Sequence, residues 1–145
     1  MKIEAGEYDD VRRWFAVAAD HVMPGLHKLP PDQRPLAMLD ETARRSPSRA
    51  SAGLAEAMGD VVEFSADLRP EQVEHLDREL VEAGLPTLGA MRARFMRGVN
   101  RILARGVIRS EREYYAVRNV ADEADGELRK QLWGLLDGFE ERRSV

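Results

Sequence analysis

Apolar residues recur at helical spacing along most of this chain, and the pattern is clearest between residues 85 and 115. On a helical wheel, one side of this stretch collects Leu88, Met91, Phe95, Val99, Ile102 and Leu103. A stripe of this kind is typical of a helix that packs on a hydrophobic core. The pattern therefore predicts a helix that begins near Pro86 or Thr87 and ends at Ala104 or Arg105.

The same stretch contains the signals for a turn and for a second helix. Gly106 follows the predicted end of the first helix, where a left-handed residue closes a helix at low cost. Ser110 and Glu113 form an S-x-x-E capping box, in which the hydroxyl accepts a backbone N–H and the carboxylate reaches back to the N–H of the cap residue. Because few residues separate the two helices, we expect them to be antiparallel neighbours.

Two helices are predicted before residue 46. Apolar residues recur at helical spacing from Tyr8 to Val22, and Pro24 with Gly25 ends that helix. A short second helix is expected to begin near Pro35, where proline suits the first helical position.

Two further helices are predicted between residues 48 and 83. Ser48 or Ser51 is expected to cap the first of them, which has a weak point at Gly59. Pro70 is placed to open the next one, since proline lacks the N–H that this position does not need.

The C-terminal residues keep one apolar phase from Tyr114 to Phe139, as a single long helix would. Such a helix would be unusually long for a small globular domain. Asp125–Gly126 is a strong turn signal, and glycine costs about 1 kcal/mol relative to alanine inside a helix. We therefore expect two helices with a tight joint at Asp125–Gly126.

Together these patterns predict an all-α fold, a compact single-domain bundle of five to seven helices with a C-terminal helical hairpin, over residues 1–145. No segment alternates with the period of two that a strand requires. With 43% hydrophobic residues, the chain is long enough for one domain with its own core. The centres of the apolar stripes are expected to be buried: Phe15, Val22, Leu54, Val61, Leu76, Leu80, Phe95, Val99, Ile102, Leu132 and Leu135.

Charge is distributed unevenly in this chain of net charge −4. Residues 86–118 hold 8 basic and 2 acidic side chains, whereas residues 1–85 hold 10 basic and 17 acidic ones. Within the basic segment, four arginines form a stripe beside the apolar face of the predicted helix, and they are the candidate partner-binding residues: Arg94, Arg97, Arg101 and Arg105. The acidic surplus of residues 1–85 favours Asp and Glu side chains of a neighbouring helix as their partners, with an acidic protein as the second candidate and a phosphate backbone as the third.

Sequence signatures of catalysis and cofactor binding are missing. The chain has no cysteine, no G-x-S-x-G, no Walker A motif and no H-E-x-x-H around His21, His27 or His75. The most metal-like group is Glu71, His75 and Glu79, whose spacing of four residues is also typical of a solvated helix face. We therefore predict no catalytic residue, no metal site and no cofactor, and favour a role without catalysis.

One aromatic pair has two interpretations. Tyr114 and Tyr115, together with Arg109 and Arg112, resemble a patch that binds single-stranded nucleic acid by stacking and phosphate contacts. The alternative is packing, because Tyr114 lies in phase with the core stripe and Tyr115 is expected to border it. We favour packing.

These features favour a small helical adaptor, immunity-like or regulatory protein that acts by binding another, acidic protein. The alternative is a nucleic-acid-binding protein that uses the same arginines, which the negative net charge and the lack of a recognisable recognition module disfavour. The acidic N-terminus lacks the pattern of a signal peptide, and the apolar run Trp14–Ala19 is too short to cross a bilayer. We therefore expect a cytoplasmic protein with no membrane association.

Overall fold

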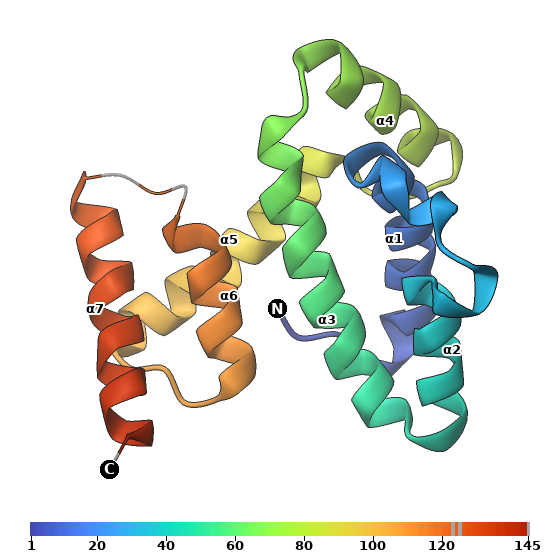
Figure 1. Ribbon diagram of the computed structural model, residues 1–145. Helices are drawn as coiled ribbons and strands as arrows, with labels where there is room; N and C mark the ends of the chain where they lie inside the picture. Colours follow the sequence, from blue (N-terminus) through green and yellow to red (C-terminus); the bar gives the residue numbers. More distant parts are fainter. Residues whose placement is uncertain (123, 125, 145) are drawn as a thin grey trace. The chain divides into compact units, whose positions relative to one another are not determined.

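The computed structural model describes residues 1–122, 124 and 126–144, and the described chain is all-α with no strand. This confirms the predicted fold class. The seven α-helices of this part of the chain are α1 (Tyr8–Val22), α2 (Pro35–Arg45), α3 (Pro47–Phe64), α4 (Pro70–Glu82), α5 (Leu88–Arg105), α6 (Glu111–Ala121) and α7 (Gly126–Arg143) (Figure 1).

The chain divides into two compact units. The first comprises residues 2–91, and the second comprises residues 92–145 together with Met1. Helix α5 extends from the first unit into the second, because its first turn belongs to residues 88–91. The single domain expected over residues 1–145 remains a prediction, and each unit is described by itself.

The core of the first unit lies where α1 packs against α3 and α4, while α2 packs against α3 (Figure 1). Its largest fully buried side chains are Trp14, Phe15, Leu54, Met58, Leu76, Leu80 and Leu88. Trp14 is fully buried, and its indole Nε1 donates a hydrogen bond of 2.9 Å to the Pro86 carbonyl. Buried indole N–H groups usually have such a partner.

The beginning of α3 differs from the prediction. Ser46, rather than Ser48 or Ser51, is the N-cap, and its hydroxyl accepts the N–H of Arg49 at 3.4 Å. The cause is Pro47, which occupies the first helical position and therefore makes the residue before it the cap. Gly59 is buried inside α3 and does not interrupt the helix.

Helix α4 ends in a Schellman motif. Gly84 has a φ of +72°, the N–H of Leu85 donates to the Leu80 carbonyl at 2.8 Å, and the Gly84 N–H donates to the Val81 carbonyl at 3.0 Å. Glycine adopts this left-handed conformation without the strain that a Cβ would cause. The next helix follows directly, and the Asp77 carboxylate accepts the N–H of Leu88 at its first residue, at 2.8 Å.

The second unit has a separate core formed by α5, α6 and α7. Helices α6 and α7 pack side by side (Figure 1). The buried side chains of this core are Val99, Ile102, Ile108, Val117, Ala121, Leu132 and Leu136. Helices α6 and α7 are separate, as expected from the turn signal, and Gly126 has a φ of +58°. Asp125, the other residue of the predicted joint, lies outside the described residues.

The turn between α5 and α6 is confirmed in most respects. Gly106 is left-handed with a φ of +82°, and its N–H donates to the Ile102 carbonyl at 2.9 Å. Ser110 caps α6 by accepting the Glu113 N–H at 3.2 Å. The prediction that Glu113 completes the capping box is wrong. Its carboxylate accepts the N–H of Arg109 at 2.7 Å instead of the N–H of the cap residue, Ser110.

Two of the residues expected in the core are only partly buried. Val22 is the last residue of α1, so its side chain is covered on fewer sides than those one or two turns earlier. Leu135 is also partly exposed, and Leu136 is buried in its place. The phase continued from α6 still borders the core, because Leu128, Leu135 and Phe139 pack against it while partly exposed, and the fully buried positions of α7 are Leu132 and Leu136.

Candidate partner-binding surface

The four predicted arginines lie on α5, but their surroundings differ. Arg94 and Arg105 are partly buried, whereas Arg97 and Arg101 are exposed and lie one helical turn apart. The stripe is therefore not a uniform row of solvated charges.

Arg105 is held inside the turn that follows α5. Its Nε and Nη2 atoms donate to the Val107 carbonyl at 3.1 and 2.9 Å, and Nη2 also forms an ion pair with the Glu113 carboxylate. Glu113 thus joins Arg105 to the N–H of Arg109 and to the first turn of α6. The partner of Arg105, Glu113, belongs to the basic segment of residues 86–118. The uneven charge distribution had instead indicated partners among residues 1–85. A carboxylate three residues after a serine cap is close to the preceding turn, and this local geometry decides the pairing.

Arg97 and Arg101 have a different status. Within the part of the chain that the structure describes, neither side chain has a hydrogen bond or an ion pair, and both are exposed. Two like charges four residues apart on a helix repel each other, by roughly 0.2–0.5 kcal/mol. An anion placed between them would relieve this repulsion.

A third exposed cation, Arg112 of α6, lies near the same surface. Burial lowers the pKa of the Met1 α-amino group, and the charges of Arg112, Arg94 and Arg101 lower it further, while Glu113 opposes them. Arginines of α5 and α6 therefore approach one point within the second unit. The sequence pattern of a single helix could not reveal the contribution of Arg112, because it depends on how α6 packs beside α5.

Tyr115 is the exposed aromatic residue closest in sequence to this charge. Tyr115 is 41% exposed and lies one turn after Arg112 on α6, so part of its ring is open to solvent. Tyr114 behaves as expected, with its ring 5.3 Å from that of Phe139 and its hydroxyl bonded to the Glu140 carboxylate. The rings of Tyr114 and Tyr115 meet edge to face, with their centroids 5.4 Å apart. Tyr114 therefore packs against side chains of its own chain.

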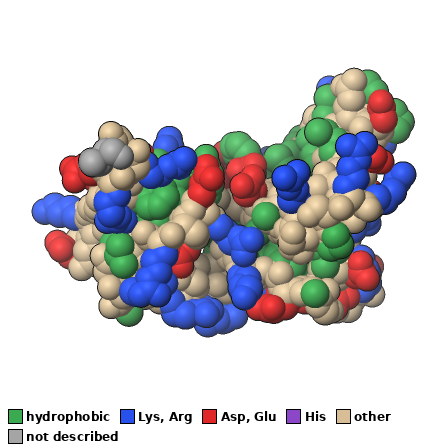
Figure 2. All heavy atoms as spheres, turned by 90° about the horizontal axis from the view of Figure 1, so that it is seen from below, with side chains coloured by type: hydrophobic (Ala, Val, Ile, Leu, Met, Phe, Trp, Pro, Cys, Tyr) green, Lys and Arg blue, Asp and Glu red, His purple; other side chains and the backbone are tan. Residues whose placement is uncertain are grey.

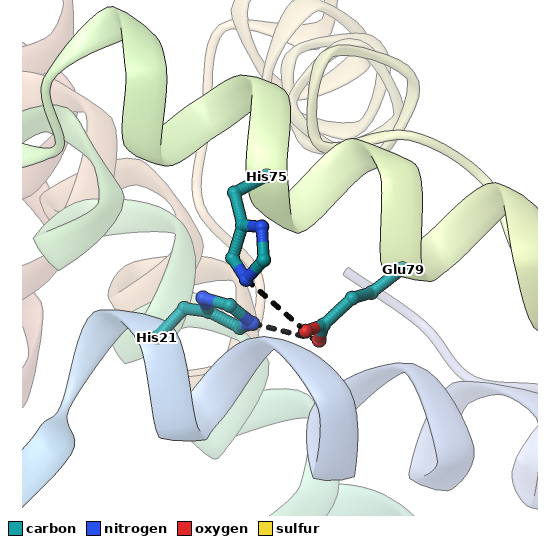
Figure 3. Close-up of side chains that lie close together, drawn as sticks. All are labelled: His21, His75 and Glu79. Atoms are coloured by element: carbon teal, nitrogen blue, oxygen red, sulfur yellow. Dashed lines mark hydrogen bonds and ion pairs between the residues drawn. The ribbon is translucent and has the colours of Figure 1, made fainter.

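A second group of interest lies in the first unit. His21 of α1 and His75 and Glu79 of α4 converge, with one ligand atom of each residue within 4.8 Å of the others (Figure 3). His21 Nε2 lies 2.8 Å from Glu79 Oε2, and His75 Nε2 lies 3.4 Å from Glu79 Oε1. The hydrogen bond with His21 is the main cause that lowers the pKa of Glu79.

The sequence pointed to a different set of residues around His75. Glu71 does not join the group and instead pairs with Arg69 at 3.4 Å, while His27 is exposed in the short 3-10 helix Pro24–Lys28. His21 was missed because it lies far from His75 in sequence, and only the packing of α1 against α4 brings the two imidazoles together.

Comparisons with protein-family models, with curated proteins and with solved structures gave no match for this chain. Across the residues that the structure describes, no helix combines the length and the apolar character needed to cross a bilayer.

Proposed function

We propose that this protein acts by binding another protein through the surface of α5 and α6 that contains Arg97 and Arg101. The observation that carries the proposal is the exposure of these two arginines one turn apart, without an ion pair in the described part of the chain. By contrast, Arg105 of the same stripe has internal partners. The two solvated guanidinium groups are thus available to a ligand.

The chemistry of these groups favours an acidic protein segment as the partner. A guanidinium group is planar and can hold a carboxylate with two parallel hydrogen bonds. Arginine and tyrosine are also enriched at the centres of protein interfaces, and Tyr115 offers an exposed ring one turn from Arg112. An extended acidic segment would satisfy the charge and gain apolar contact with this ring.

A phosphate backbone would use the same cations and is the second candidate. Acidic and basic side chains are interspersed on the face that Figure 2 presents, and the net charge of the chain is −4. Both features weaken the sequence-independent attraction on which nucleic-acid binding depends. Tyr114, moreover, is packed against Phe139, which removes one of the two rings that could stack on bases. The cytoplasmic location expected from the sequence remains part of the proposal.

Titrations with two anionic probes distinguish the candidates. A fluorescent Glu-rich peptide and a single-stranded DNA of equal charge are each titrated with the protein at low salt, and the titrations are then repeated at increasing salt. The proposal expects tighter binding of the peptide. Preferential binding of the DNA, with an affinity that falls steeply with salt at a slope of about −0.7 per phosphate contact, would replace it with the nucleic-acid function.

A pair of double variants assigns the binding to α5. Arg97→Gln with Arg101→Gln is expected to abolish peptide binding at low salt. Arg44→Gln with Arg45→Gln is the control, because it removes the same charge from another helix, where both arginines pair with Glu41. An equal loss of peptide affinity in both double variants would show that only net charge matters. If the unaltered protein binds neither the peptide nor the DNA, the proposal that the α5 surface binds a partner is rejected.

A further inference from the structure

The group of His21, His75 and Glu79 has the composition and spacing of a metal site. Two imidazoles and one carboxylate are ligands typical of zinc sites that keep a fourth position open, and of sites for other divalent transition metals. Zinc binds imidazole nitrogen and carboxylate oxygen at about 2.0–2.2 Å, so tetrahedral ligand atoms lie roughly 3.4 Å apart. In the structure one ligand atom of each residue lies within 4.8 Å of the others, with Glu79 Oε2 at 2.8 Å from His21 Nε2 and Glu79 Oε1 at 3.4 Å from His75 Nε2.

The backbone that carries these side chains is anchored by the core. On α4, His75 and Glu79 are one turn apart and therefore face the same side, and they are neighbours of the fully buried Leu76 and Leu80. On α1, His21 follows the buried Ala18 and Ala19. The packing of α1 against α4 in one unit holds the three ligand atoms within 4.8 Å of one another.

The existing contacts show how a cation would fit. Each oxygen of Glu79 faces a different imidazole, and the two rings stand edge to face with centroids 5.3 Å apart (Figure 3). The His21 side chain is 19% exposed and that of His75 is 61% exposed, so the group has a covered side and a side open to solvent. A tetrahedral ion bound to the three side chains would place its fourth ligand, a water molecule, toward the open side.

We propose that His21, His75 and Glu79 form a binding site for one Zn²⁺ ion, which links the end of α1 to α4. The site belongs to the first unit and involves none of the arginines of α5. It therefore stands independently of the proposed protein-binding function. Because the three ligands come together only in the folded state, zinc binding is expected to raise the stability of the first unit.

Zinc titration of the purified chain without a histidine tag tests the proposal. Isothermal calorimetry is expected to give one bound Zn²⁺ per chain and a higher melting temperature in its presence. Cobalt(II) added in place of zinc is expected to give the intense visible absorption of tetrahedral coordination. The absence of zinc binding would overturn the proposal, and so would cobalt spectra of the hexaaqua ion only.

Variants assign the ion to the three residues. His75→Asn changes an exposed side chain, so the fold is expected to survive, which circular dichroism checks, while zinc affinity falls at least about tenfold. Glu71→Gln and His27→Gln are the matched controls on the same helix and in the neighbouring 3-10 helix, and both are expected to bind zinc as the unaltered chain does. Zinc affinity that is unchanged in His75→Asn, or that falls equally in the controls, would contradict the site.

Discussion

The indole Nε1 of Trp14 donates a hydrogen bond of 2.9 Å to the backbone carbonyl of Pro86, which joins α1 to the segment that leads into α5. Trp14 is fully buried, so the bond is made where water does not replace it. Trp133 is a contrast within the same chain, because its buried Nε1 has no hydrogen-bond partner among the described residues.

This contrast predicts unequal effects of removing the two indole N–H groups. Trp14→Phe leaves the Pro86 carbonyl without its donor and is expected to lower the free energy of unfolding by about 1–3 kcal/mol, in addition to the packing loss. Trp133→Phe removes no hydrogen bond and is expected to cost less. Urea unfolding of the two variants measures the difference, and a larger loss in Trp133→Phe would contradict the assignment.

The glycines of α5 and its turn provide a second prediction. Gly106 is left-handed, so Gly106→Ala is expected to destabilise the protein by about 1–2 kcal/mol through backbone strain, although the added Cβ would meet no described atom within 4 Å. Gly98 lies inside α5, where a Cβ also meets no described atom within that distance, and Gly98→Ala is expected to stabilise by about 0.5–1 kcal/mol. Thermal melts in which both substitutions shift the melting temperature in the same direction would contradict the left-handed conformation of Gly106.

The phase of α7 is tested by two adjacent leucines. Leu136 is 1% exposed and belongs to the second core, so Leu136→Ala is expected to cost roughly 2–5 kcal/mol. Leu135 is partly exposed, and Leu135→Ala is expected to cost clearly less. Chemical denaturation measures both costs. A larger cost for Leu135→Ala than for Leu136→Ala would support the buried position that the sequence alone indicated.

Acid stability depends on the pair of Arg12 and Asp40. Two hydrogen bonds, Nε to Oδ1 at 2.8 Å and Nη2 to Oδ2 at 2.6 Å, lower the pKa of Asp40. Because this pKa is lower in the folded state than in the unfolded state, the stabilisation is present above about pH 4 and is lost as the pH falls through the folded value.

The variant Arg12→Gln removes the cause of the shift, so its unfolding free energy is expected to decrease less between neutral pH and about pH 3 than that of the unaltered protein. Arg45→Gln is the control, since its pair with Glu41 is largely exposed. Urea denaturation at a series of pH values provides the measurement. Parallel pH profiles for Arg12→Gln and the unaltered chain would rule out this role of Asp40.

Local sequence signals predicted most of the fold because helix periods and caps act over a few residues. Gly106 and Ser110 are placed as expected, since each responds to its own neighbours. Contacts between distant residues could not be predicted in the same way. The approach of His21 to Glu79 depends on the packing of α1 on α4, and which of the adjacent Leu135 and Leu136 is buried more deeply depends on how α7 packs on the second core.

The candidate surface shows the same division. Helical spacing correctly placed the arginines on α5, but it treated them as equivalent. Only the turn that follows shows that Arg105 is bound by Glu113, and only the tertiary structure brings both Arg112 and Arg101 close enough to the Met1 α-amino group to lower its pKa. Charge count in a sequence thus indicates where cations gather, while the number of them open to a partner depends on tertiary structure.

The proposed protein-binding function is tested most directly by one combined measurement on the variant Arg97→Gln with Arg101→Gln. Its melting temperature and its binding of a fluorescent Glu-rich peptide, followed by anisotropy at low salt, are compared with those of the unaltered chain. The account predicts an unchanged melting temperature with loss of peptide binding, because these side chains contact solvent rather than the core. A lower melting temperature with retained peptide binding would show that the two arginines serve the fold, and would contradict the account.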